Sequence, residues 1–381
     1  MNILICPDSF KNSLNAIEVS KAIELGVQKN NKNHNIKKLP LADGGEGSLD
    51  VLINNEQGKY ITVPVKNPLL RDIQASYGVI NKTAVIEMAR AAGLDLLKPE
   101  ERNPMLTTTY GVGELIKHAL DQGIQKFIIA IGGSATNDCG IGVASALGVK
   151  FLDEEGKPIK NTGQGLASLH KIDYDNIDQR ILSSEIKVLC DVNNPLYGKN
   201  GAAYVYAKQK GASEEMIKTL DSNLKHFSKI VKNTFNEDIS NMPGSGAAGG
   251  LGAGLMLFLK GKLVSGFDTI RVILDLEKYI ESSDLIITGE GKIDSQSFNG
   301  KVAIEVSKIA KKYNKPVIGI VGSYEDDLKK FHDQGMTSVF SIIHNPMTLE
   351  AALNKELTEQ SLCDLSEEVM RLIRISKNII E

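Results

Sequence analysis

The sequence lacks the features of several large protein classes. Tryptophan is absent and aromatic residues make up only 5% of the 381 residues, which leaves little for the stacking platforms of single-strand binders. The 44 basic residues are scattered, and they nearly balance 47 acidic residues, for a net charge of −3. A basic surface for nucleic acid therefore has little support. We expect a small dissolved ligand and no nucleic-acid partner.

Long apolar runs and cysteine motifs are also missing. No apolar run approaches the roughly 18 residues needed to cross a bilayer, and the N-terminal MNILICPDSF has no basic leader. The four cysteines (Cys6, Cys139, Cys190 and Cys363) show no CxxC or Cys/His spacing, which suggests reduced thiols and neither disulfides nor a zinc site. These observations predict a cytoplasmic protein with no membrane partner. The weakly charged surface is compatible with a monomer or a homodimer.

A chain of 381 residues is long enough for two domains, and its pattern of strands and helices predicts how they are arranged. Five strands, each followed by a helix, are expected at 2–6, 36–42, 284–289, 315–322 and 338–343. This pattern is typical of a flavodoxin-like doubly wound parallel sheet interrupted by an insertion. The predicted domains are a discontinuous flavodoxin-like domain, 1–60 plus 284–381, and an inserted α/β domain, 61–283.

The loops after the predicted strands are rich in glycine and polar residues. In an open parallel sheet, ligands bind beyond the carboxyl ends of the strands, so these loops are the candidate site. PDSFKNS, ADGGEGS and TGEGKIDSQSFNGK follow the first three strands of the flavodoxin-like pattern. Their candidate residues are Asp8, Ser9, Lys11, Asp43, Gly44, Gly45, Glu46, Gly289, Glu290, Asp294, Gln296 and Lys301.

Three further loops of this kind lie in the predicted insertion: IGGSATND, CDVNNPL and MPGSGAAGGLGAG. Backbone N–H groups at glycine turns and helix N-termini bind anions such as phosphate. The candidates are Gly132, Gly133, Ser134, Thr136, Asn137, Asp191, Asn194, Gly244, Gly246 and Gly249, and Asn137 with Asp138 could cap the next helix. The alternative for IGGSATND is an ordinary strand-to-helix turn with a capping aspartate.

The residue types in these loops suit phosphoryl transfer. That reaction needs Mg²⁺ held by a few carboxylates, a group that positions the acceptor, and cations on the moving phosphoryl group. Any single aspartate is more often a turn or cap residue, and it is their joint placement at strand ends that favours a site. Arg102 is a candidate to bind a carboxylate or phosphate, or else an ordinary surface arginine. Walker A, Rossmann and protein-kinase motifs are absent from the sequence.

Eight segments, in order, resemble the bacterial type I glycerate kinases: CPDSFKNSLNAIEVSKAI, LADGGEGS, VIEMARAAGL, ERNPMLTTTYGVGELI, IGGSATND, CDVNNPLYGKNGAA, MPGSGAAGGLGA and ITGEGKIDSQSFNGKV. The match covers essentially the whole chain. The resemblance implies a flavodoxin-like domain interrupted by an α/β domain of restriction-enzyme-like fold. It also implies the phosphorylation of D-glycerate by Mg-ATP, with 2-phospho-D-glycerate as product and 3-phosphoglycerate as the alternative.

Motif placement suggests a role for each group of residues. Asp191 or Asp43 would accept the proton of the glycerate hydroxyl, and Glu290 with Asp294 would hold Mg²⁺. The backbones of 132–137 and 244–250 would bind phosphates. Lys11 and Lys301 would neutralise charge, and Arg102 would take the glycerate carboxylate.

The chain departs from the family pattern at three positions, where Cys139, Ala92 and Ala303 replace the usual Gly, Ser and Pro. The Cys139 side chain is expected to crowd a contact between backbone and anion. Two alternative functions remain open: a kinase for another small hydroxy acid, and a non-catalytic sensor of glycerate.

Overall fold

The structure, a computed structural model, describes residues 1–294, 300–325 and 327–380, and it separates into two compact units. The first unit comprises Met1–Asp43, Asp50–Asn55 and Phe267–Glu381, and the second comprises Gly44–Leu49 and Glu56–Gly266. The domain boundaries given above, 1–60 plus 284–381 and 61–283, stay a prediction. No helix in the described ranges is long and apolar enough to cross a membrane.

The first unit is built on a parallel five-stranded sheet. Its strands are β1 (Asn2–Ile5), β2 (Asn35–Lys38), β11 (Leu285–Ile293), β12 (Val317–Tyr324) and β13 (Ser338–Ser341). They are ordered β13-β12-β11-β1-β2, and every neighbouring pair is parallel. Taken in chain order, this is the 2-1-3-4-5 arrangement of flavodoxin-like sheets, which confirms the predicted fold class. The strand order reverses between β1 and β11, so the topological switch point lies there.

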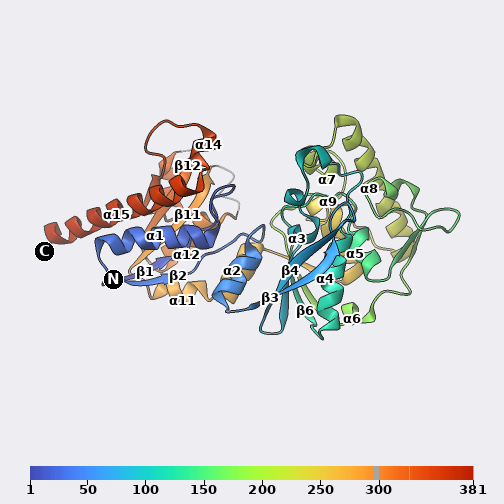
Figure 1. Ribbon diagram of the computed structural model, residues 1–381, viewed down its shortest axis with the longest axis horizontal. Coiled ribbons are helices and arrows are strands. Elements are labelled where there is room, and N and C mark those ends of the chain that lie inside the picture. The colour runs from blue at the N-terminus through green and yellow to red at the C-terminus, as the bar shows by residue number, and fades with distance from the viewer. Residues whose placement is uncertain (295–299, 326, 381) are drawn as a thin grey trace. The chain divides into compact units, whose positions relative to one another are not determined.

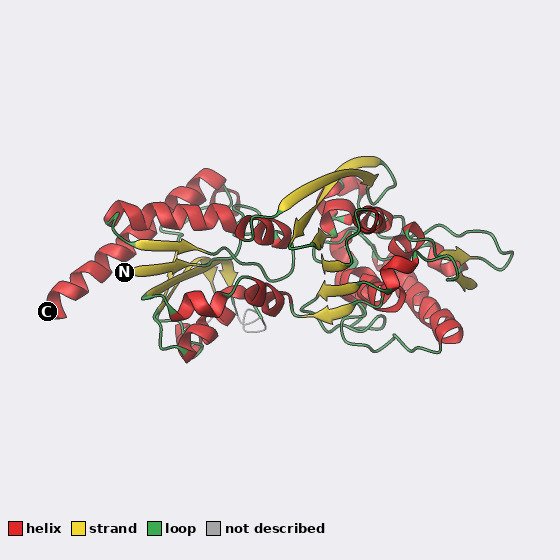
Figure 2. Ribbon diagram, turned by 90° about the horizontal axis from the view of Figure 1, so that it is seen from below, coloured by secondary structure: helices red, strands yellow, loops and turns green. Residues whose placement is uncertain are grey.

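Helices cover both faces of this sheet, as Figure 2 shows. The helices that lie wholly in the first unit are α1 (Ala16–Asn30), α11 (Leu276–Glu281), α12 (Val302–Lys312), α13 (Leu328–Asp333), α14 (Leu349–Ala352) and α15 (Lys355–Ile380). Two others, α2 (Ser48–Asn55) and α10 (Gly266–Ile273), begin in the second unit and end in the first.

Helix α1 shows how local sequence and packing agree in the first unit. It begins with a capping box, in which the Asn15 side chain accepts from the Glu18 N–H and the Glu18 carboxylate accepts from the Asn15 N–H. It packs along α15 (Figure 1) at Gly26, where a Cβ atom would lie 2.0 Å from the Cys363 carbonyl oxygen. Only glycine permits this close approach of the two helices.

The second unit contains a mixed six-stranded sheet and a small hairpin. The strands are β3 (Lys59–Lys66), β4 (Asp72–Ile80), β5 (Thr83–Glu87), β6 (Lys126–Ala130), β9 (Glu185–Leu189) and β10 (Lys262–Val264), with β7 (Lys150–Leu152) and β8 (Lys171–Asp173) paired separately. The large sheet is ordered β10-β9-β6-β5-β4-β3, antiparallel from β3 to β5 and parallel from β5 to β10. The three-residue strands β7, β8 and β10 were not predicted, because they are too short to show a periodic pattern.

The helices of the second unit surround a large apolar core. They are α3 (Ala89–Ala92), α4 (Tyr110–Asp121), α5 (Ile141–Ala146), α6 (Gln179–Leu182), α7 (Ala202–Tyr206), α8 (Glu214–Phe235) and α9 (Ala247–Leu259), with the 3₁₀ turns η1 (Leu94–Leu96), η2 (Pro99–Glu101), η3 (Gly165–Ser168) and η4 (Lys208–Lys210). Helix α9 is buried along most of its length, and three residues near its start have left-handed backbone angles: Ala248, Gly249 and Gly250.

Candidate active site

The switch point of the first unit brings two predicted carboxylates together. The chain continues to pair beyond β1, because the Asp8 N–H donates to the Gly289 carbonyl at 2.9 Å. This pairing places Asp8 beside Glu290, which lies within β11. Gly291 allows the chain after Asp8 to cross closely, since a Cβ atom there would lie 3.2 Å from Phe10 Cα. The strand-end placement expected from the topology is thus observed for Asp8. For Glu290 it is wrong, because β11 continues to pair with β12 as far as Ile293 and so runs past the end predicted at 289.

These carboxylates form a strongly negative cluster. Burial, followed by the charges of Asp43 and Glu290, raises the pKa of Asp8 well above its usual value. Burial also raises the pKa of Glu290 to about 7, although Lys301 opposes the shift from 2.7 Å away, and Asp43 and Asp294 add to it. Glu290 Oε2 is buried and has no hydrogen-bond partner among the described residues. A cation bound here would relieve the repulsion.

The donor set fits Mg²⁺. Within the described ranges, no group of three or more His, Cys, Asp or Glu side chains is arranged to hold a metal ion on its own. Mg²⁺ is usually bound by one or two carboxylates together with water and substrate phosphates, so a complete protein cage is not required. The orphaned Glu290 oxygen supplies one such ligand. Asp294 lies near it, and its carboxylate is 3.6 Å from the Lys292 ammonium.

The remaining predicted residues of the first unit are less engaged. Lys11 is exposed, and Ser9 is half-buried, its N–H bonded to the Asp8 carboxylate at 2.6 Å. Gln296 lies outside the described residues. Lys292, which was not predicted, forms a 3.0 Å ion pair with Glu325. It follows Gly291 within β11 and projects near the cluster, a placement that only the strand register reveals.

In the second unit, glycine segments from distant parts of the chain pack backbone against backbone. Gly249 has φ of +71°, and a Cβ atom there would lie 2.0 Å from the Thr136 carbonyl oxygen. A Cβ atom at Gly132 would lie 2.8 Å from Gly45 Cα. The structure therefore brings together three of the predicted loops, whose glycines are Gly44, Gly45, Gly132, Gly133, Gly244, Gly246 and Gly249. Glu46, from the first of these loops, is exposed.

The turn after β6 contains buried polar side chains without partners. Within the described part of the chain, no hydrogen bond reaches Thr136 Oγ1 or either amide atom of Asn137, and Ser245 Oγ, in the predicted loop that contains Gly249, also lacks one. Buried polar groups are normally paired, so these atoms mark a place that a ligand or water completes. The predicted helix cap by Asn137 is wrong, because its amide makes no such bond. Asp138, in contrast, accepts hydrogen bonds from the Gly140 N–H and, at the start of α4, from Thr109.

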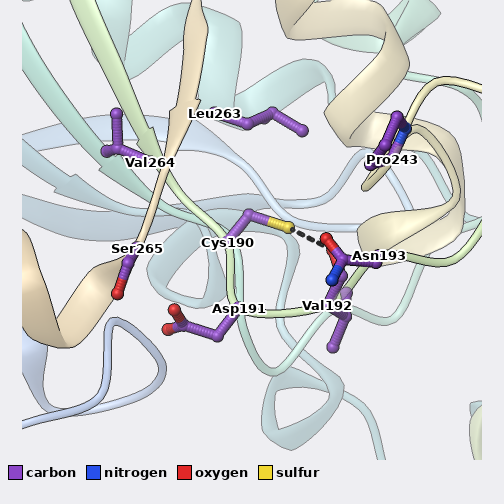
Figure 3. A pocket seen from close by; sticks show the side chains of 8 residues that line it. All are labelled: Cys190, Asp191, Val192, Asn193, Pro243, Leu263, Val264 and Ser265. Atoms are coloured by element: carbon purple, nitrogen blue, oxygen red, sulfur yellow. Dashed lines mark hydrogen bonds between the residues drawn. The ribbon is translucent and has the colours of Figure 1, made fainter. Parts of the chain in front are cut away.

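Asp191 lies directly after β9 and lines a pocket (Figure 3). Both of its carboxylate oxygens lie 3.1 Å from the Gly266 nitrogen, whose N–H they accept. The pocket has a volume of about 390 Å³ and is lined by Cys190, Asp191, Val192, Asn193, Pro243, Leu263, Val264 and Ser265. Figure 3 shows the Asp191 carboxylate and the Ser265 side chain on one side of the pocket, away from Leu263 and Pro243. The pocket thus joins one acidic group to an apolar wall.

Asn194 and Arg102, two other predicted residues, differ in how the structure engages them. The Asn194 amide donates to the Asn200 carbonyl at 2.8 Å and accepts from the Tyr206 hydroxyl at 2.6 Å, so it shapes its own loop. Arg102 is half-buried, and its Nε atom is closed off without a partner in the described ranges. The alternative, that Arg102 is an ordinary solvated surface arginine, is therefore wrong for its Nε atom.

Comparisons with known proteins identify the family. The model of the glycerate kinase family matches residues 3–374. The chain belongs to the glycerate kinase family. It is 47% identical over 354 residues to Escherichia coli K12 glycerate 2-kinase, covering 92% of this chain and 93% of the relative. It is 46% identical over 375 residues to the Haemophilus influenzae glycerate kinase, covering 98% and 99%.

A solved structure agrees with this assignment. A crystal structure from Salmonella typhimurium LT2, described as a glycerate kinase 2, matches with a TM-score of 0.87 at 43% identity and covers 99% of both chains. The predicted family resemblance and the α/β fold class are therefore confirmed. The chain is a kinase, and ATP is the co-substrate that membership of a glycerate kinase family implies.

One departure from the usual glycerate kinase pattern has a visible structural setting. Cys139 is fully buried with φ of +54°, in the left-handed region that glycine adopts at little cost. Its N–H donates to the Gly249 carbonyl at 3.2 Å, and its sulfur lies 2.8 Å from where a Gly250 Cβ atom would be. The expected crowding of an anion by this side chain stays a prediction.

Sequence reasoning about this glycerate kinase missed Lys210. It is the last residue of η4, its side chain is buried, and its ammonium contacts the turn after β6. In the sequence it lies in the polar stretch AKQKGAS, where a lysine is expected to be exposed. No periodicity or motif singles it out.

Proposed function

We propose that the protein transfers the γ-phosphoryl group of ATP to the C2 hydroxyl of D-glycerate, giving ADP and 2-phospho-D-glycerate. Membership of the glycerate kinase family supports the reaction class. The observation that carries it for this chain is Asp191, a carboxylate held by the Gly266 N–H in a pocket of about 390 Å³. Small-molecule sites are commonly concave and contain a few fixed polar groups that orient the ligand, and Asp191 is such a group here.

Asp191 is the proposed catalytic base. It accepts the proton of the glycerate hydroxyl while that oxygen bonds to the γ-phosphorus and the bond from phosphorus to the ADP oxygen breaks. The Gly266 N–H, which donates to both carboxylate oxygens, fixes the orientation of the Asp191 side chain. A base of this kind typically contributes about 10² to 10⁴ in rate. The alternative base is Asp43, in the carboxylate cluster of the first unit.

Glu290 and Asp294 are the proposed Mg²⁺ ligands. Their support is the orphaned, buried Glu290 oxygen and the crowding of negative charge around it. When bound, Mg²⁺ would screen the negative charge of the ATP phosphates. Lys301, now paired with Glu290, and the exposed Lys11 would neutralise charge on the transferred group.

The glycine loops are the proposed phosphate cradle. The backbones of 132–137 and 244–250 would donate N–H groups to phosphate oxygens, supported by their close packing and by the unpartnered Thr136 and Asn137 side chains. Arg102 would bind the glycerate carboxylate, supported by its closed-off Nε atom. Further substrate or phosphate contacts are proposed for Asp8, Ser9, Gly44, Gly45, Glu46, Ser134, Asn194, Gly289 and Gln296.

The test is a ³¹P NMR spectrum of the purified protein with Mg-ATP and D-glycerate. We expect a new phosphomonoester signal that matches 2-phosphoglycerate. A signal that matches 3-phosphoglycerate would keep the kinase and change the position. Turnover only with other short hydroxy acids would change the acceptor, and tight glycerate binding without any new ester would favour a sensor.

We also propose a cytoplasmic location, supported by the four free thiols, which suit a reducing compartment. The oligomeric state is proposed as monomer or homodimer. Light scattering of the purified chain, at 41.4 kDa per copy, separates the two.

A further inference from the structure

Lys210 occupies an unusual place for a lysine. Its side chain is only 2% exposed, and it reaches the turn after β6 from η4, over seventy positions along the chain. The Nζ atom donates to Ser134 Oγ at 2.7 Å and to the Thr136 carbonyl oxygen at 2.7 Å. Both acceptors belong to the predicted phosphate turn, Gly132–Asn137.

The burial of Lys210 is not balanced by an ion pair. Among the described residues, no carboxylate lies within ion-pair distance of its ammonium. Asp138 favours the charged form from a distance, yet its carboxylate is already engaged with Thr109 and Gly140. Burial accordingly lowers the pKa of Lys210 to about 7. A methionine side chain would fill a similar space without the cost of burying an ammonium group. Packing alone therefore does not explain why this residue is a lysine.

The lysine instead orients the peptide group that joins Thr136 to Asn137. The carbonyl of Thr136 and the N–H of Asn137 belong to one planar group and point in opposite directions. Because Lys210 holds the carbonyl on its own side, the Asn137 N–H is turned to the other side. The same carbonyl is the one against which Gly249 packs, with a Cβ position only 2.0 Å away. Lys210 thus fixes the peptide where the two phosphate loops meet.

We propose that Lys210 is a positioning residue for the phosphate-binding turn Gly132–Asn137, acting through Ser134 and Thr136 without touching the nucleotide. The inference rests on the proposed function, because it takes this turn to bind a phosphate of ATP. It assigns to Lys210 a role in nucleotide affinity and leaves the glycerate pocket at Asp191 independent of it.

The test compares Lys210→Met with Lys208→Met. Lys208 lies in the same 3₁₀ turn, but its side chain is 80% exposed, so its loss controls for a change of charge. MgATP binding is measured by calorimetry without glycerate, and kinetic constants are measured for both substrates. For Lys210→Met we expect at least tenfold weaker MgATP binding and a KM for glycerate within twofold of wild type. For Lys208→Met we expect both to stay within twofold.

A second variant separates positioning from general loss of structure. Ser134→Ala removes one of the two Lys210 acceptors and keeps the Thr136 contact, so we expect about threefold weaker MgATP binding. Combined with Lys210→Met it should add nothing further, because Lys210→Met already removes the contact with Ser134. A further loss of binding would show that Ser134 contacts the phosphate itself and does not act through Lys210. If Lys210→Met does not fold, Ser134→Ala decides alone, and unchanged binding overturns the proposal.

The outcomes also distinguish this inference from the proposed function. A folded Lys210→Met protein that binds MgATP as wild type does overturns the role of Lys210 while the kinase stands. Wild-type protein that binds MgATP but phosphorylates nothing refutes the kinase, and a loss of binding in Lys210→Met then still supports the positioning role. Wild-type protein that does not bind MgATP refutes both.

Discussion

The two units build their candidate sites by different means. In the first unit, charged side chains gather at the switch point of a parallel sheet, and burial together with mutual repulsion shifts their pKa values. In the second, backbone segments pack through glycines beside unpartnered polar atoms and the buried Lys210 amine, and one carboxylate, Asp191, lines a pocket. Loss of a carboxylate charge should therefore disturb metal binding in the first unit. In the second unit, added side-chain bulk should disturb the glycine packing, and replacement of Asp191 should disturb catalysis.

The largest expected effect is on catalysis by Asp191→Asn. We expect kcat to fall by about 10² to 10⁴ with little change in KM, because an amide keeps the shape but cannot accept the proton. Steady-state kinetics with Asp175→Asn, an exposed aspartate elsewhere in the same unit, provides the control. An unchanged kcat would remove Asp191 from the mechanism and move the role of base to Asp43 in the first unit.

Gly249→Ala should strongly destabilise the second unit. Its positive φ and a backbone oxygen 2.0 Å from the new Cβ atom act together, so we expect a loss of roughly 2–4 kcal/mol in the free energy of unfolding. Gly123→Ala is a matched control, because its φ is +78° but nothing lies within 4 Å of the added atom. It should lose only about 1 kcal/mol. Equal losses in urea unfolding would show that close packing is not what the second unit depends on.

Glu290→Gln tests the first unit by metal binding. We expect Mn²⁺, used as a spectroscopic substitute for Mg²⁺, to bind about tenfold more weakly in electron paramagnetic resonance titrations without nucleotide. The physical reason is the loss of negative charge at a buried oxygen that lacks a partner. Glu325→Gln, at an exposed carboxylate paired with Lys292, should bind Mn²⁺ as wild type does. Equal affinity in both variants would place the metal elsewhere.

Lys210 should also make the stability of the protein depend on pH. The pKa of Lys210 is about 7 in the folded protein, and its ordinary value of 10.5 applies to the unfolded chain. Between pH 7 and pH 10.5, the unfolded chain therefore binds more protons than the folded one. The free energy of unfolding should then rise with pH across this window, by at most about 1.4 kcal/mol per pH unit, relative to Lys210→Met. Urea unfolding of both proteins at pH 7, 8 and 9 measures the difference. Parallel curves would show that the amine titrates at its ordinary pKa.

Much of the first unit could be predicted from the sequence. The alternation of strands and helices predicts the parallel sheet, and the loop that follows β1 predicts a carboxylate at the ligand edge, as found for Asp8. Lys292 was missed because its neighbours depend on the strand register. In the second unit the glycine loops were recognised, but the short strand β10 and the partners of the loops were not.

What the sequence by itself determined is the fold class of the first unit, the family, and the loops that carry polar chemistry, because periodicity and motifs are local properties of the chain. Only the tertiary structure decided that Gly249 packs on Thr136, that the Asn137 amide lacks a partner and that Lys210 is buried. These facts depend on contacts between segments that are far apart in the sequence. The local sequence around a lysine is the same whether its ammonium group is solvated or bonded to two oxygens of a buried turn. The tertiary contacts of distant segments decide between the two.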